Sequence, residues 1–220
     1  MKKTLAVAIT TLLVGMSGLA SAYTINYTYN STTDGGYTSP YAGVMVETFD
    51  APLLFSWAGD YAILTGSVID HNASPFGLSS NDSTQYITTP DTLGLPLQDS
   101  VRATNFGGTF YTYLGLWWGS ADSYNNINFY KGSDLVQTIT GTEAISPSDA
   151  NGHQLAPTTN LYINFLELPA FDSFELVSTN YAFEADNIAV GMPVPEPGTI
   201  LLLGAGFLGL AIYGKRRKNA

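Results

Sequence analysis

Acidic side chains are the residues of this sequence whose type and spacing best suit a metal ion. Glu184 and Asp186 alternate within a run of apolar residues, so a strand would place both carboxylates on one face. Glu47 and Asp50 bracket the end of another such run. Because Ca²⁺ takes about 6–8 oxygen ligands, we expect these four acids to be candidate ligands of a structural calcium ion. The alternative is that they face water and keep an edge strand soluble.

A second group of side chains has the composition of a sugar-binding surface, with an aromatic ring for stacking beside polar groups for hydrogen bonds. Its members are Trp118, Asp122, Tyr124 and Asn125. Adjacent Trp117 and Trp118 would point to opposite faces of a strand, so we expect one of them to fill the core. Asp122 with Asn125 and Asn126 is an alternative oxygen cluster for calcium, or equally an Asx-rich turn.

The patterns of common enzymes are missing from the sequence. There is no G-x-S-x-G elbow, no H-E-x-x-H and no phosphate-binding glycine loop. His71 and His153 lie in polar, turn-like segments without a nearby nucleophile. The chain has no cysteine, and no pair of carboxylates stands out among its 18 acids. We therefore predict a protein that is not an enzyme, with no cofactor other than a possible structural calcium; a hydrolase is the remote alternative.

The elements that must position these residues are short strands separated by Gly, Pro, Asn and Asp. They are expected at 24–29, 44–49, 62–69, 109–118, 127–130, 135–140, 161–166, 174–178 and 181–190. Lys131 to Asp134 would form the turn of a hairpin, and residues 67–100 are rich in loop-forming residues. Without a convincing amphipathic helix or repeat, residues 23–190 are predicted to form an all-β domain, a single antiparallel, jelly-roll-like β-sandwich.

The charges are divided between the body and the two ends of the chain. The formal charge is −10, and six of the eight Lys and Arg residues lie near the termini. Without those six bases the remainder carries −16, which leaves Arg102 and Lys131 as its only Lys or Arg. Such a body would repel phosphate backbones, so a nucleic-acid partner is excluded.

The N-terminal residues 1–22 have the features of a signal peptide. Lys2 and Lys3 precede an apolar stretch, and Ala20-Ser21-Ala22 fits a signal-peptidase site, so the mature protein would begin near Tyr23. An uncleaved anchor is the alternative. We expect signal peptidase to be a partner during export.

The C-terminal residues combine a proline-rich linker, an apolar run and a basic cluster. Residues 191–198 form the linker, which contains Pro195, Glu196 and Pro197. The apolar run from Ile200 to Tyr213 would give about 21 Å of helix, short of a ~30 Å hydrocarbon core. Residues 199–220 are therefore expected to form a marginal transmembrane helix followed by a cytoplasmic basic tail of Lys215, Arg216, Arg217 and Lys218.

The order of Pro-Glu-Pro, short apolar helix and Arg-rich tail resembles the PEP-CTERM sorting signal of Gram-negative exosortase systems. The resemblance covers the last 26 residues or so. It implies that an exosortase cleaves near Pro195, Glu196 and Pro197 and that residues 199–220 are discarded. The protein would be anchored transiently in the inner membrane and then released or attached at the cell surface. A plain C-terminal anchor is the alternative.

Two weaker resemblances concern the body. The run Trp118-Gly119-Ser120-Ala121-Asp122-Ser123-Tyr124-Asn125 resembles a Trp-Gly-Ser-x-Asp-x-Tyr-Asn signature of exosortase-dependent surface proteins, as do the hairpin and Thr140-Gly141 that follow. The four acids of the calcium hypothesis look like an arrangement in jelly-roll carbohydrate-binding modules. We therefore expect a non-enzymatic surface or matrix protein associated with biofilm or exopolysaccharide. The alternative is a secreted calcium-dependent carbohydrate-binding module.

Overall fold

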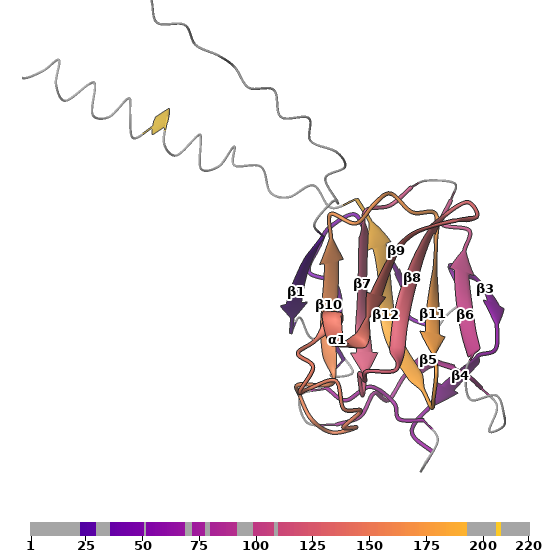
Figure 1. Cartoon of the computed structure of the whole chain (residues 1–220). Helices are drawn as coiled ribbons and strands as arrows, with labels where there is room; N and C mark the ends of the chain where they lie inside the picture. The colour runs from indigo at the N-terminus through magenta and orange to yellow at the C-terminus, as the bar shows by residue number, and fades with distance from the viewer. Residues whose placement is uncertain are drawn as a thin grey trace, which may run out of the picture.

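The computed structural model describes residues 23–29, 36–50, 52–68, 72–77, 80–91, 99–107, 110–192 and 206–207. Within them the chain forms two antiparallel sheets, one behind the other, and a one-turn helix, α1 (Gly141–Ala144) (Figure 1). The all-β prediction is confirmed at this level, and the finer jelly-roll description stays a prediction.

The larger sheet has seven strands. In spatial order they are β1 (Thr24–Thr28), β10 (Leu161–Leu166), β7 (Tyr113–Gly119), β12 (Phe183–Gly191), β5 (Gln85–Thr89) and β4 (Ala62–Thr65), with β2 (Met45–Glu47) also pairing with β12. The smaller sheet has the order β3 (Ser56–Gly59), β6 (Asp99–Thr104), β11 (Ser173–Ser178), β8 (Asn125–Lys131) and β9 (Asp134–Thr140). Consecutive strands β7 and β8 therefore lie in different sheets.

Each strand predicted from the sequence is present, most with shifted or shorter bounds, while β3, β5 and β6 were not predicted. Strand β5 lies in the stretch that we expected to be loop-rich, partly because of Pro90. In the structure Pro90 directly follows β5, so it ends the strand and does not prevent it. The hairpin is confirmed, since Lys131 pairs with Asp134 across a turn in which Gly132 has a φ of +63°. A φ in this region is one that glycine adopts without steric cost.

The main core lies between the two sheets. Leu116 and Trp118 of the larger sheet and Ile127 and Phe174 of the smaller sheet are fully buried there. The Trp118 ring stacks on Phe183, with 4.3 Å between the ring centroids. Burial of such side chains is the main favourable contribution to folding of the domain.

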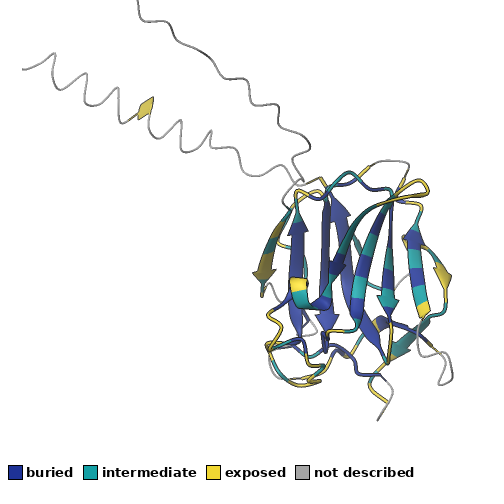
Figure 2. Cartoon of the chain, in the orientation of Figure 1, coloured by how far each residue is buried: buried dark blue, intermediate teal, exposed yellow. Residues whose placement is uncertain are grey.

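The outer face of the larger sheet is also covered. Trp117 and Tyr162 form a second buried cluster with Tyr37, whose ring lies 5.4 Å from that of Trp117. Further along the same face, the backbone N–H of Ala73 donates to Glu184. Strands β7 and β12 are consequently buried on both faces, whereas β1 and β3 at the sheet edges are mostly exposed (Figure 2).

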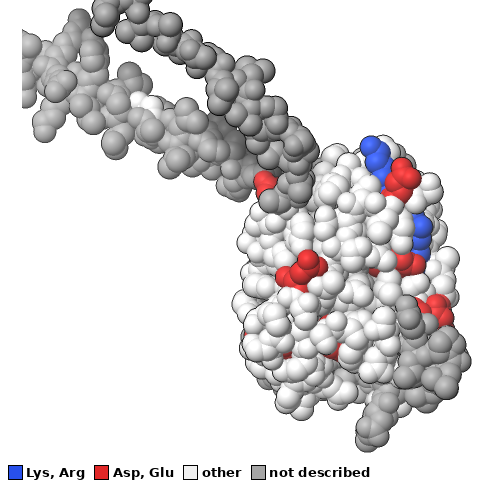
Figure 3. All heavy atoms as spheres, in the orientation of Figure 1, with Lys and Arg blue, Asp and Glu red and all other residues white. Residues whose placement is uncertain are grey.

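The outer face of the smaller sheet is open and polar. Strand β8 alternates buried residues such as Phe129 with half-buried polar ones such as Asn128 and Tyr130. The two bases of the body, Arg102 and Lys131, belong to this sheet. Figure 3 shows basic side chains next to acidic ones at one side of the face in view, while most of that face is uncharged.

The predicted terminal segments cannot be compared with the structure. Residues 1–22, 193–198 and 199–220 lie outside the described residues, apart from Gly206 and Phe207. In the part of the chain that is described, no helix has the length and apolarity needed to cross a membrane.

Candidate functional site

The segment with the Trp-Gly-Ser-x-Asp-x-Tyr-Asn pattern carries the chain from one sheet to the other. Strand β7 ends at Gly119 and β8 begins at Asn125, so residues 120–124 cross one end of the sandwich. The N–H of Ala121 donates to the carbonyl of Thr159 at 2.8 Å, and the N–H of Gly152 donates to the carbonyl of Ala121 at 3.2 Å. These two hydrogen bonds fix the crossing segment against the connection that precedes β10.

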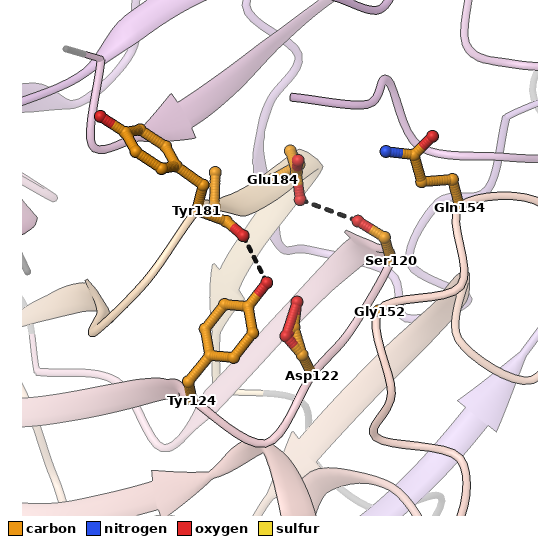
Figure 4. Close-up of a pocket in the computed structure, with 8 residues that line it drawn as sticks. Ser120, Asp122, Tyr124, Gly152, Gln154, Tyr181 and Glu184 are labelled. Atoms are coloured by element: carbon orange, nitrogen blue, oxygen red, sulfur yellow. Dashed lines mark hydrogen bonds between the residues drawn. The ribbon is translucent and has the colours of Figure 1, made fainter. Parts of the chain in front are cut away.

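The crossing segment forms one wall of a polar pocket of about 280 Å³, which we call the Asp122–Glu184 pocket (Figure 4). Its lining residues come from the crossing segment, the start of β12 with the two residues before it, and the loop before β10. They are Ser120, Asp122, Tyr124, Gly152, Gln154, Tyr181, Ala182 and Glu184. Three polar positions of the signature, Ser120, Asp122 and Tyr124, thus meet in one hollow with a carboxylate from a distant strand.

Glu184 lies on the covered outer face of β12, 3% exposed. Its Oε1 accepts from the Ala73 N–H at 2.9 Å, and its Oε2 accepts from the Ser120 hydroxyl at 3.0 Å. Burial raises the pKa of the Glu184 carboxyl to about 8; its hydrogen bonds only partly oppose this, and the nearby charge of Asp122 adds to it.

Asp122 is also 3% exposed. Burial raises the pKa of its carboxyl to about 7, against a lowering effect of the Tyr124 hydroxyl. The single proton of the Tyr124 hydroxyl is donated to the carbonyl of Tyr181, which fixes the hydroxyl beside the Asp122 carboxyl. The Asp122 Oδ1 atom is buried and has no hydrogen-bond partner.

The pocket therefore holds two interacting carboxyl groups and no Lys or Arg. Arg102 and Lys131, the only such bases within the described ranges, lie on the smaller sheet, where Arg102 covers the Tyr130 ring and Lys131 lies over that of Phe110. Two carboxyls that titrate near neutral pH can bind a positively charged group or, when protonated, donate hydrogen bonds.

Only part of the predicted sugar-binding group is available to a ligand. Asp122 and Tyr124 line the pocket, but Trp118 is fully buried in the main core, so its ring cannot stack on a sugar; that prediction is wrong. Trp117 is buried as well, on the opposite face of β7. Asn125 is a structural residue, since it donates to the Ala182 carbonyl and accepts from the Ser178 hydroxyl.

The four predicted calcium ligands divide among separate places. The Glu47 carboxylate accepts hydrogen bonds from the backbone N–H groups of Phe49, Leu54 and Phe55. Its oxygens therefore stabilise the chain segment that follows β2. Glu184 belongs to the pocket described above. Among the described residues, no group of three or more His, Asp or Glu side chains is arranged to hold a metal ion. Calcium binding stays a prediction.

Asp50 and Asp186 lie near each other and near Asp82, an acid that we did not predict as a ligand. Asp186 is 1% exposed, and its pKa is raised well above the usual value by burial, then by the charges of Asp82 and Asp50. The expectation that alternation places Glu184 and Asp186 on one face is confirmed, because Ala185 between them faces the main core.

Sequence reasoning missed several pocket residues. Gln154 and Tyr181 lie in loops whose sequence carries no motif, whereas Ser120 is the third position of the signature and could have been included. Gly141 supports the site from behind: a Cβ atom there would lie 1.9 Å from the Asp122 carbonyl oxygen. The Thr140-Gly141 that follows the hairpin is thus explained by close packing against the crossing segment.

Among protein families, the chain matches the PEP-CTERM protein-sorting motif over residues 193–218. The match includes Pro195, Glu196 and Pro197 and the basic tail, all of which lie outside the described residues. It supports an exosortase-dependent protein, with export and membrane-anchored sorting. None of the curated proteins compared with the chain matches it. The surface-domain signature of the body stays a prediction.

Proposed function

We propose that this chain is an exported exosortase substrate whose β-domain is a non-enzymatic component of the cell surface or extracellular matrix, in contact with biofilm or exopolysaccharide. The observation that carries the proposal is the sorting-motif match at residues 193–218. The match begins two residues after β12 ends at Gly191, so the sorting signal directly follows the last strand of the domain.

The course of export follows from the two ends. Signal peptidase removes residues 1–22, and the apolar segment at 199–220 holds the protein in the inner membrane until exosortase cleaves near Pro-Glu-Pro. The product keeps the acidic body and loses all six terminal bases. It is then suited to contact cations or neutral polar surfaces instead of nucleic acid.

The sorting step is tested by intact mass of the mature protein from cells with and without exosortase. We expect loss of both ends, and retention of residues 215–218 when Pro195, Glu196 and Pro197 are all changed to Ala. Met192→Ala, at the exposed position just before the matched stretch, is the matched control and should leave processing unchanged. A final product that keeps Lys215 to Lys218 in normal cells would contradict the proposal.

The matrix role is tested separately by deleting the gene and scoring matrix formation, surface adhesion and aggregation. Complementation with the triple Ala variant should fail if sorting is needed for the role. Hydrolysis of a polysaccharide by the purified protein would refute the non-enzymatic part of the proposal.

The second candidate is a carbohydrate-binding module, and the Asp122–Glu184 pocket is the observation that favours it. The pocket offers the Ser120 and Tyr124 hydroxyls, the exposed Gln154 amide and two carboxyl groups in one hollow. Small-molecule sites place a few convergent polar groups in this way. A glycan array with and without calcium tests this candidate, and absence of binding in both conditions would exclude it.

A further inference from the structure

We propose that the Asp122–Glu184 pocket binds a primary ammonium group carried by a sugar, so that its ligand is an amino-sugar unit of an extracellular polysaccharide. The inference rests on the carbohydrate-binding candidate above and names the chemical class of its ligand. It does not depend on the sorting step.

Charge is the first support. Asp122 and Glu184 are both 3% exposed, and no Lys or Arg lines the pocket to neutralise them. Buried carboxylates are stable in ionised form only when a positive charge or several donors lie beside them. A cationic ligand supplies the charge that the described lining residues do not.

The hydrogen-bond inventory is the second support. Asp122 Oδ1 is a buried acceptor without a donor, on a side chain that points toward the pocket (Figure 4). Glu184 has one donor on each oxygen and retains further acceptor capacity. An ammonium group has three donors and no acceptor, so it matches a pocket in which acceptors are in excess.

Pocket size and the remaining polar groups favour a sugar over a bare metal ion. The volume of about 280 Å³ far exceeds the space of a single ion or of one water. Only two carboxyl side chains line the pocket, and among the described residues no group of three or more acidic or His side chains is arranged to hold a metal, whereas Ca²⁺ takes about 6–8 oxygen ligands. Ser120, Tyr124 and Gln154 are placed to hydrogen-bond hydroxyl groups next to the amine.

The glycine at position 152 contributes space beside the carboxylate. A Cβ atom there would lie 3.2 Å from Asp122 Oδ2, closer than most such contacts. A side chain at this position would fill the hollow next to the carboxylate that is to receive the ammonium group.

The experiment compares two ligands that differ only in the acetyl group: a β-1,4-linked glucosamine tetramer and its fully N-acetylated form. Full-length protein purified in detergent is titrated calorimetrically with each at physiological ionic strength, where long-range attraction to the acidic body is screened. We expect the amine form to bind at least tenfold more tightly than the acetylated form.

Two variants of equal charge test the location. Asp122→Asn should weaken binding of the amine form at least tenfold, whereas Glu175→Gln, on the outer face of the other sheet, should leave it unchanged. If Asp122→Asn does not fold, Gln154→Ala at the exposed rim provides the second test and should weaken binding several-fold. Equal weakening by Asp122→Asn and Glu175→Gln would show non-specific attraction and overturn the proposal.

The remaining outcomes separate the inference from the function on which it rests. If both tetramers bind equally and Asp122→Asn abolishes this binding, the pocket does not recognise the ammonium group, but it still binds carbohydrate. Absence of binding by either tetramer would overturn the inference, while the glycan array decides on the candidate. A parallel titration with CaCl₂ that shows Asp122-dependent binding and displaces the amine form would assign the pocket to a metal instead.

Discussion

Glu175 and Glu184 lie on the outer faces of the two sheets, and their surroundings move their pKa values in opposite directions. Burial raises the pKa of Glu184 to about 8. At Glu175 burial acts in the same direction, but hydrogen bonds from Ser100, Tyr130 and Asn128 and the charge of Arg102 outweigh it, so the pKa is lowered.

The difference comes from what covers each face. Glu175 is half-buried on an open face, where Tyr130 donates to Oε2 at 2.8 Å and the Arg102 guanidinium lies 4.0 Å from the Tyr130 ring centroid. Glu184 lies under the Ala73 segment, and no Lys or Arg among the described residues lines its pocket. The Glu175 carboxylate already has hydrogen-bond donors and a nearby positive charge within the protein. A buried carboxyl without a counter-charge, such as Glu184, is a better candidate for ligand binding.

The largest effect on stability is expected from a substitution in the second buried cluster, on the covered face of the larger sheet. Trp117→Ala should lower the free energy of unfolding by about 3–5 kcal/mol, because it empties a fully buried position under Tyr37. Tyr130→Ala on the open face should cost only about 1–2 kcal/mol, through the lost hydrogen bond to Glu175 and the lost contact with Arg102. Urea unfolding of both variants measures the difference, and equal losses would contradict it.

The stability of the domain should depend on pH through the carboxyl groups of the covered face. Because the folded-state pKa of Glu184 is raised from 4.5 to about 8, the folded protein holds a proton that the unfolded chain releases. The free energy of unfolding should therefore fall as pH rises from about 5 to 8, by up to about 1.4 kcal/mol per pH unit for one such group. Asp122, with its pKa raised to about 7, acts in the same direction.

Two matched variants measured at pH 5 and pH 8 sharpen this comparison. Glu184→Gln should reduce the decline, and the Asp122 contribution should remain. Glu175→Gln should leave the decline unchanged, because the lowered pKa of Glu175 adds stability that is lost only at acid pH. A decline of the same size in both variants would mean that Glu184 is ionised at neutral pH.

The smallest expected effects compare two glycines. Gly141→Ala should cost about 1–3 kcal/mol, because its Cβ would overlap the Asp122 carbonyl behind the pocket. Gly132→Ala, in the open hairpin turn, meets nothing within 4 Å and should cost about 1 kcal/mol through its φ of +63° alone. If Gly141→Ala proved as mild as Gly132→Ala, the crossing segment would be less tightly packed than the structure shows.

Local patterns in the sequence were enough to predict nine of the strands and the hairpin, but not β3, β5 and β6. Alternation and turn residues act between neighbours along the chain, so β8, β9 and their turn could be placed in advance. Strand β6 escaped prediction because its outward residues, Ser100 and Arg102, are polar and its inward ones, Val101 and Ala103, are small. Trp118 was assigned to a ligand surface on composition, and only its stacking on Phe183 shows that it belongs to the core.

The sorting motif, the acidic body and the all-β class could be identified from the sequence alone, because each depends on composition or on residues close together in the chain. Tertiary structure alone decided which acids meet. Glu184 and Asp122 are 62 positions apart and come together because β7 pairs with β12 and the chain then crosses to β8. Long-range packing decides which loop covers a sheet face and therefore which carboxylate is shielded from solvent. No local sequence pattern encodes that packing.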